Sequence, residues 1–259
     1  MKRLLPIFLF FFGCETFDVA TDNPLDPSNP EYVKPTISIL SPSDQQTINA
    51  DKVDVTFQGN ELVTEYRYKI VTSDAYKAVG WSDWFTSNKL SLEFLNEYTY
   101  TINAQSRYLN EETSDETSVT FTVDAVKPSS LLLYPKQIQG NVFANSKLLL
   151  YAHELTNVSA LDFIIEYDET KMAFAGNQGS KVYGDVNVVR NSTNQIHYTI
   201  GKYGNNGFAQ NALIAEIVFQ MKDVSGLSSF IKILSPTAKS LDGQTIEIVG
   251  ANQTRVDIK

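Results

Sequence analysis

The side chains best suited to chemistry are few and lie far apart in the sequence. The chain has two histidines, His153 and His197, and one cysteine, Cys14. Neither histidine belongs to a motif with the ligand spacing of a zinc site. The sequence also lacks a Gly-x-Ser-x-Gly nucleophile elbow and a phosphate-binding Gly-Lys-Ser/Thr motif. We therefore expect a binding protein that has no enzymatic activity and no bound metal or cofactor.

The cysteine ends a segment with the layout of an export signal. Lys2 and Arg3 precede an apolar run over residues 4–12, and Gly13 comes directly before Cys14. A basic start, a short apolar stretch and a small residue at the cleavage point are typical of a secretory signal peptide. Residues 1–14 also resemble the signal and lipobox of bacterial lipoproteins, which implies cleavage before Cys14 and acylation of its thiol. The alternative is an ordinary signal peptide with an incidental cysteine.

The charge balance agrees with an exported binding protein. The net charge is −9, and loss of residues 1–13 would remove two cations and no acid, giving −11. Such an acidic chain is a poor ligand for nucleic acid. A lipidated Cys14 predicts a membrane anchor in the bacterial cell envelope, at the outer membrane or the cell surface. Residues 15–34 hold three prolines among acids and asparagines, which predicts a disordered tether.

Residues 35–126 read as a first β-sandwich. Short segments with period-2 alternation occur at 36–40, 53–57, 66–70, 90–94, 98–104 and 119–123. The stretch from Leu92 to Tyr98 and the strand after it resemble a fibronectin type III or immunoglobulin-like domain. The resemblance implies that the hydroxyl of Tyr98 bonds back to the backbone at a corner between two strands. Trp81 and Trp84 could form a sugar-stacking platform or pack against the sheet.

Residues 127–259 read as a second all-β domain. Strand-like segments occur at 131–134, 147–151, 161–167, 172–174, 186–189, 196–200, 213–221, 230–234, 245–249 and 254–258. Their number suits a nine-stranded jelly-roll sandwich. The order of Asp162-Phe163, Tyr167-Asp168 and the run 213–219 resembles that of cohesin domains. The resemblance implies that this domain binds a dockerin, a small double-helix module that carries calcium, so the calcium would belong to the partner.

Strand alternation then predicts the position of a binding face. If Phe163, Ile165 and Tyr167 point into the core, Asp162 points outward. In cohesins the matching aspartate makes a central hydrogen bond to the partner. We expect the face to comprise Ala160, Asp162, Ile164, Glu166, Arg190, His197 and Thr199.

Three functions are compatible with these observations. The favoured one is a surface-anchored adaptor whose cohesin-like domain binds a protein, such as an enzyme with a dockerin that degrades polysaccharide. The second is a lipoprotein that binds polysaccharide, since cohesins share their jelly roll with carbohydrate-binding modules. The third is a structural or adhesion protein of the envelope. Exposed, coplanar aromatic side chains would favour the second.

Overall fold

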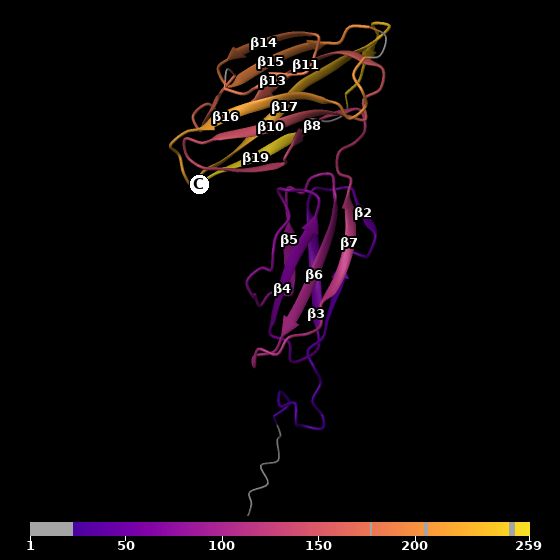
Figure 1. Ribbon diagram of the computed structural model, residues 1–259, viewed down its shortest axis with the longest axis vertical. Helices are drawn as coiled ribbons and strands as arrows, with labels where there is room; N and C mark the ends of the chain where they lie inside the picture. Colours follow the sequence, from indigo (N-terminus) through magenta and orange to yellow (C-terminus); the bar gives the residue numbers. More distant parts are fainter. Residues whose placement is uncertain (1–22, 177, 205–206, 249–251) are drawn as a thin grey trace, which may run out of the picture.

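The computed structural model describes residues 23–176, 178–204, 207–248 and 252–259. Cys14, the apolar leader and residues 15–22 of the expected tether lie outside them. Every regular element in the described part of the chain is a β-strand, which confirms the all-β prediction. Two sandwiches follow one another along the sequence, as Figure 1 shows. Within the described ranges, no helix is long and apolar enough to cross a membrane.

The first sandwich contains a three-stranded and a four-stranded sheet. The first sheet has the order β1 (Ile37–Ser41), β3 (Val53–Gly59) and β5 (Lys89–Leu92). The second has the order β2 (Gln46–Ile48), β7 (Thr117–Val123), β6 (Thr99–Arg107) and β4 (Glu65–Thr72). Phe57, Tyr100 and Phe121 are fully buried in the core of this sandwich. These strand numbers are those of an immunoglobulin-type sandwich.

The second sandwich contains a five-stranded and a seven-stranded sheet around its own core. The smaller sheet has the order β12 (Met172–Phe174), β16 (Leu213–Met221), β10 (Asn145–His153) and β8 (Ser130–Tyr134), with β13 (Lys181–Val182) paired to β16. The larger has the order β14 (Val186–Ser192), β15 (Gln195–Gly201), β11 (Val158–Glu166), β17 (Ser228–Ser240), β19 (Gln253–Ile258) and β9 (Gln137–Gly140), with β18 (Thr245–Ile246) paired to β17. This is the jelly-roll class that the sequence predicts, although short segments such as β9 and β13 raise the strand count above nine.

Strand β17 is longer than its sequence pattern indicates. The alternation suggests a strand that ends at Leu234, but β17 continues through Ser235 and Pro236 to Ser240. The register against β11 shifts between Asp162 and Ile164, opposite the Ser235-Pro236 pair. A bulge accepts a proline there because a bulged residue leaves the hydrogen-bond ladder.

The corner tyrosine of the first sandwich is Tyr100 rather than Tyr98. The Tyr100 hydroxyl donates to the carbonyl of Asn96 and accepts from its N–H, both at 3.0 Å. Tyr100 lies inside β6 and is fully buried, whereas Tyr98 precedes the strand and is only half-buried. The resemblance therefore placed the corner two residues too early.

Residues 23–34 form turns that contact the first sandwich, whereas the sequence predicts a disordered tether over residues 15–34. Three successive turn hydrogen bonds span residues 23–32. The Tyr108 hydroxyl donates to the carbonyl of Val33 at 2.6 Å, and the Asn110 amide donates to the carbonyl of Leu25 at 3.0 Å. Asparagine, aspartate and proline form turns as readily as they form disordered chain, and here the turns dock on the first sandwich.

A buried hydrogen-bond network joins the two sandwiches. Asp74 is fully buried, and its carboxylate accepts from the Asn96 amide at 2.7 Å and from the Tyr100 hydroxyl at 3.0 Å. It also accepts at 3.1 Å from the hydroxyl of Tyr134, which belongs to the second sandwich. The Asn96 side-chain oxygen in turn accepts from the backbone N–H of Lys136 at 2.8 Å. Specific polar contacts therefore fix the orientation of the two domains.

Candidate partner-binding face

Strand β11 carries the centre of the predicted face. Phe163 and Ile165 are fully buried in the core, while Asp162 and Ile164 on the other side of the strand are half-buried. This is the alternation expected of a strand with one face in a core and one face outside. Figure 1 shows β11, β15 and β14 on the side of the second sandwich that lies away from the first.

The strand registers place the predicted side chains on one surface. Asp162 lies opposite Thr199, and Ile164 lies opposite His197 on β15. Arg190 on β14 lies opposite the same His197. Residues directly opposite in neighbouring strands share a face of the sheet. The outer face is therefore defined here as Ala160, Asp162, Ile164, Glu166, Arg190, His197 and Thr199.

Asp162 is held in place by two neighbours on this face. One carboxylate oxygen is 2.9 Å from His197 Nε2, and the other accepts from the Thr199 hydroxyl at 2.7 Å. Partial burial works to raise the pKa of Asp162, but the hydrogen bonds from His197 and Thr199 and the charge of Arg190 outweigh it and lower that pKa. The side chains of Asp162 and His197 remain 44% and 39% exposed. Asp162 is thus an ionised, oriented acceptor with part of its hydrogen-bonding capacity open to solvent.

The sequence did not identify several further members of the same surface. Val186 and Val188 on edge strand β14 are 42% and 43% exposed, and Val188 lies opposite Thr199. Leu234 on β17 lies opposite Ile164 and is half-buried. The alternation of residues 186–190 could have revealed the two valines. Leu234 could be assigned to this surface only from the pairing of β17 with β11, which no local sequence pattern indicates.

Glu166 lies at the end of the outer face, beside a depression. It is opposite Lys232 on β17, and both side chains line an open cavity of about 440 Å³. Asp162, His197 and Thr199 are not among the residues that line this cavity. Asp162 therefore lies on the sheet surface beside this depression and not in its wall.

The described residues contain no cluster of three or more His, Cys, Asp or Glu side chains that could hold a metal ion. On the outer face, Asp162 contacts His197, whose side chain is of a type that can bind a metal. The Nε2 atom of His197 is engaged in a hydrogen bond with the Asp162 carboxylate. The arrangement provides hydrogen-bond acceptors, donors and apolar contacts. This chemistry suits recognition of a partner.

The two tryptophans of the first sandwich are packed against cations. The guanidinium of Arg67 lies 4.7 Å from the Trp81 ring centroid and 4.6 Å from that of Trp84. Lys69 lies 4.7 Å from Trp81, and Arg107 lies 4.6 Å from Trp84. Each ring therefore makes cation–π contacts with two cations of the same sandwich. These contacts favour packing against the sheet over a sugar-stacking platform for the two tryptophans.

Comparison with known proteins gives similarity in solved structures only. No family model matches the chain, and no curated protein matches it. The sixth cohesin of scaffoldin B from Acetivibrio cellulolyticus, solved with a Cel5 dockerin mutant, is 14% identical over 51% of this chain and 100% of its own, with a TM-score of 0.44. A type I cohesin–dockerin complex from Clostridium thermocellum is 14% identical over 50% of this chain and 99% of its own, with a TM-score of 0.44. A non-cellulosomal cohesin from Archaeoglobus fulgidus is 11% identical over 51% and 92%, with a TM-score of 0.43. At these values the matches are a likeness of fold and carry no conclusion about partners.

Proposed function

We propose that this protein is a non-catalytic adaptor, anchored by lipid at Cys14, whose outer face binds a protein partner. The observation that carries the proposal is the oriented, ionised and half-exposed carboxylate of Asp162 among apolar side chains. A charged acceptor fixed by two neighbours loses little freedom when a donor of a partner reaches it. Ile164 and Val188 supply apolar area beside it. Polar groups within an apolar patch are the usual make-up of a protein interface.

The face favours a protein partner over a polysaccharide. The residues of the outer face include no tryptophan, tyrosine or phenylalanine, while the nearest aromatic of β15, Tyr198, is buried in the core. Sugars in open sites stack on exposed aromatic rings, because one face of a sugar ring is apolar. Without such rings, the outer face offers a polysaccharide only scattered hydrogen bonds.

The kind of partner follows from the resemblance to cohesins. A dockerin-like module would present helices to the sheet and bring its own calcium. Arg190, Lys232 and Glu166 surround the centre with charges of both signs, which would orient such a partner. The resulting adaptor would hold a polysaccharide-degrading enzyme at the cell surface.

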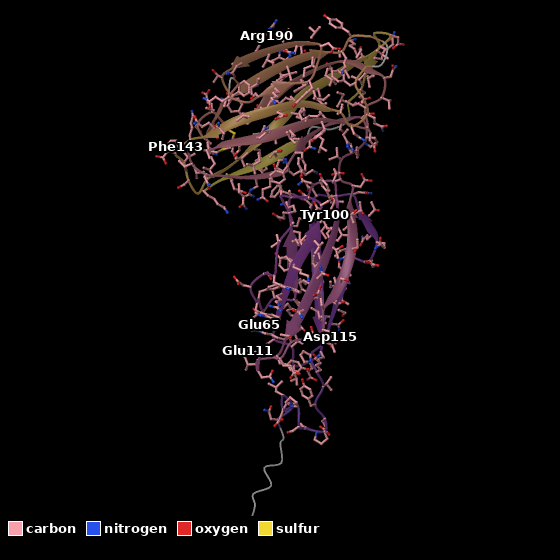
Figure 2. All side chains as sticks on the ribbon, viewed as in Figure 1. Glu65, Tyr100, Glu111, Asp115, Phe143 and Arg190 are labelled. Carbon is pink, nitrogen blue, oxygen red and sulfur yellow. The ribbon has the colours of Figure 1, made fainter. Side chains whose placement is uncertain are left out.

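The position of the outer face suits this role. Figure 2 labels Arg190 at one end of the molecule, and Glu65, Glu111 and Asp115 near the other. Residues 23–34 dock at that other end through Tyr108 and Asn110. A lipid on Cys14 would therefore leave the outer face directed away from the membrane.

The test is capture of partners by the full mature chain and by Asp162→Ala, from secreted and surface proteins, first with calcium and then with a chelator. We expect the wild type to retain an enzyme that elutes when calcium is removed. Asp162→Ala should weaken its binding by about 1–3 kcal/mol, the cost of losing a charge-assisted interfacial hydrogen bond. Asp223→Ala is the matched control, since Asp223 is exposed on another loop and should bind normally. Equal affinity of wild type and Asp162→Ala would remove Asp162 from the interface.

Anchoring is tested separately through Cys14. Cys14→Ser removes the thiol that would be acylated, so we expect the protein to leave the membrane fraction and appear in the soluble one. Detection of lipid on the wild-type chain by mass spectrometry is the direct measurement. A Cys14→Ser protein that stays with membranes would overturn the lipid anchor and leave the assignment of the outer face unchanged.

A further inference from the structure

A cavity of about 290 Å³ lies where the two sandwiches meet, and we call it the junction cavity. Glu97 and Tyr98 line it from the first sandwich, and Tyr134, Tyr151 and His153 line it from the second. Ligand pockets commonly occur at domain interfaces, with volumes from about 300 to 1,000 Å³. The junction cavity is at the small end of that range, so it suits a compact ligand.

Three tyrosines form an angled aromatic wall in the junction cavity. The Tyr134 ring centroid is 6.0 Å from that of Tyr98, with 44° between the ring planes. It is 6.5 Å from that of Tyr151, with the planes at 77°. Rings at such angles offer apolar faces in more than one direction, while each phenol keeps a polar tip.

The polar groups of the junction cavity retain unused hydrogen-bonding capacity. Within the described ranges, the His153 ring and the Tyr151 hydroxyl bond to no other protein group, although both side chains are half-buried. Burial raises the pKa of Tyr151, so its hydroxyl stays a proton donor at neutral pH. The Asn211 amide oxygen accepts from the N–H of Glu154 at 2.8 Å, which leaves its NH₂ group for a ligand. Polar groups without protein partners bond to water or to a bound polar molecule, so these groups are available to a ligand.

We propose that the junction cavity binds the ring of a neutral sugar. A pyranose combines an apolar face of C–H groups, which packs on a tyrosine, with hydroxyls that both donate and accept hydrogen bonds. His153, Tyr151 and Asn211 provide donors and acceptors at the cavity wall. The Glu97 carboxylate in the same wall is paired with Lys136 at 3.6 Å, so the wall has no excess of positive charge that would hold an acidic sugar.

The walls of the junction cavity are fixed before any ligand arrives. Tyr134 is tied to Asp74 of the first sandwich at 3.1 Å, and Glu97 accepts from the N–H of Ala125 at 3.1 and 3.2 Å. A site that is already rigid loses less conformational entropy on binding. Tyr134 therefore belongs both to the hydrogen-bond network around Asp74 that connects the two sandwiches, which we call the joint, and to the wall of the junction cavity.

The proposal is independent of the outer face. Strands β14, β15 and β11 lie on the far side of the second sandwich from the joint in Figure 1. A protein partner and a sugar could therefore be bound together. An adaptor with such a site would contact the glycan on which its bound enzyme acts.

The experiment is ligand-observed NMR and calorimetry on the full mature chain. The probes are glucose, galactose, mannose, xylose, N-acetylglucosamine and the β-1,4-linked disaccharides of glucose and xylose, with glucuronic acid as the acidic comparison. We expect saturable binding of at least one neutral sugar and weaker or no binding of glucuronic acid. Tyr151→Ala should weaken binding about tenfold or more, which corresponds to about 1.4 kcal/mol.

Matched variants separate the cavity from general sugar stacking. Tyr203 is 74% exposed on a loop of the same sandwich, so Tyr203→Ala should bind as the wild type does. His153→Ala should also weaken binding. Should Tyr151→Ala fold poorly, as judged by near-ultraviolet circular dichroism, Tyr151→Phe keeps the ring and removes only the hydroxyl. Asp162→Ala should bind the sugar normally, and Tyr151→Ala should capture protein partners normally.

Three results would overturn the proposal. One is the absence of saturable binding of every neutral probe to the wild type. Another is full affinity in both Tyr151→Phe and His153→Ala. The last is an equal loss of affinity in Tyr203→Ala. None of them bears on the outer face, which is tested with Asp162→Ala and a protein partner.

Discussion

Two aspartates in this molecule accept similar hydrogen bonds in very different surroundings. Asp74, at the joint, is fully buried and is bonded by Asn96, Tyr100, Tyr134 and the backbone N–H of Tyr76. Asp162, on the outer face, is bonded by His197 and Thr199, and its side chain is 44% exposed.

The difference separates a structural role from a binding role. The protein itself uses all the hydrogen-bonding capacity of Asp74. Removal of this carboxylate therefore breaks several hydrogen bonds at once. Asp162 has only two protein donors and keeps acceptor positions open to solvent. We therefore expect Asp74 to determine the stability and the domain orientation, and Asp162 to determine the affinity for a partner.

The largest expected effect is that of Asp74→Ala on stability. The substitution leaves the hydroxyl of Tyr134 and the amide of Asn96 without their acceptor, while the Tyr100 hydroxyl keeps the carbonyl of Asn96. Each unsatisfied group costs about 1–3 kcal/mol, so the free energy of unfolding should fall by at least about 2 kcal/mol. Urea denaturation measures it.

Two probes in that experiment report on different parts of the molecule. Both tryptophans lie in the first sandwich, so their fluorescence follows that sandwich, while far-ultraviolet circular dichroism follows both. We expect the two transitions to separate in Asp74→Ala because the joint is lost. Asp83→Ala, at an exposed position of the same sandwich, should change stability by no more than about 0.5 kcal/mol. A similarly small change in Asp74→Ala would contradict the structural role of the joint.

An intermediate effect is expected for Arg67→Ala in the first sandwich. Arg67 stacks between Trp81 and Trp84 and bonds to the Gln105 side chain at 2.6 and 3.1 Å. Loss of two cation–π contacts and of the packing of the aliphatic stem should lower the free energy of unfolding by about 1–2 kcal/mol. The tryptophan emission should shift to longer wavelength as water reaches the rings.

Arg190→Ala is the matched control for Arg67→Ala. Arg190 is exposed on the edge strand β14, so its removal should change stability by no more than about 0.5 kcal/mol. An equal loss of stability in both variants would show that the contacts of Arg67 with the tryptophans contribute nothing beyond those of any surface arginine.

Local patterns in the sequence predicted the outer face because the relevant information was local. Asp162 and Ile164 alternate with Phe163 and Ile165 within one strand, and a strand has a fixed period of two. The pairing with His197 and Thr199 followed from a hairpin with a clear alternation of its own. Such patterns also indicated the all-β class and the jelly roll.

The joint was not predictable in the same way. Asp74 lies in a turn, and its partners Asn96, Tyr100 and Tyr134 are 22, 26 and 60 residues away. No period or motif links these positions, because they meet only when two separate cores have formed and docked. The same reason hid the junction cavity, whose tyrosines come from both sandwiches. The extension of β17 past Pro236 was missed because its pairing with β11 is also long-range.

The smallest expected effect is that of Asp162→Asn on stability, and it depends on pH. The folded state lowers the pKa of Asp162 below its usual 3.8, so the charged form favours folding. That contribution is complete above about pH 4 and is lost as the pH falls through the folded pKa. Because the side chain is 44% exposed and screened by solvent, the difference between wild type and Asp162→Asn should be at most about 0.5 kcal/mol at pH 7.

Urea denaturation of both proteins at pH 7, 5 and 3 measures this dependence. The difference should shrink between pH 5 and pH 3, because protonation makes the wild-type side chain as neutral as asparagine. A loss of several kcal/mol at pH 7 would make Asp162 a second structural aspartate and would erase its contrast with Asp74. A small stability change together with a large loss of partner affinity would confine the role of Asp162 to binding.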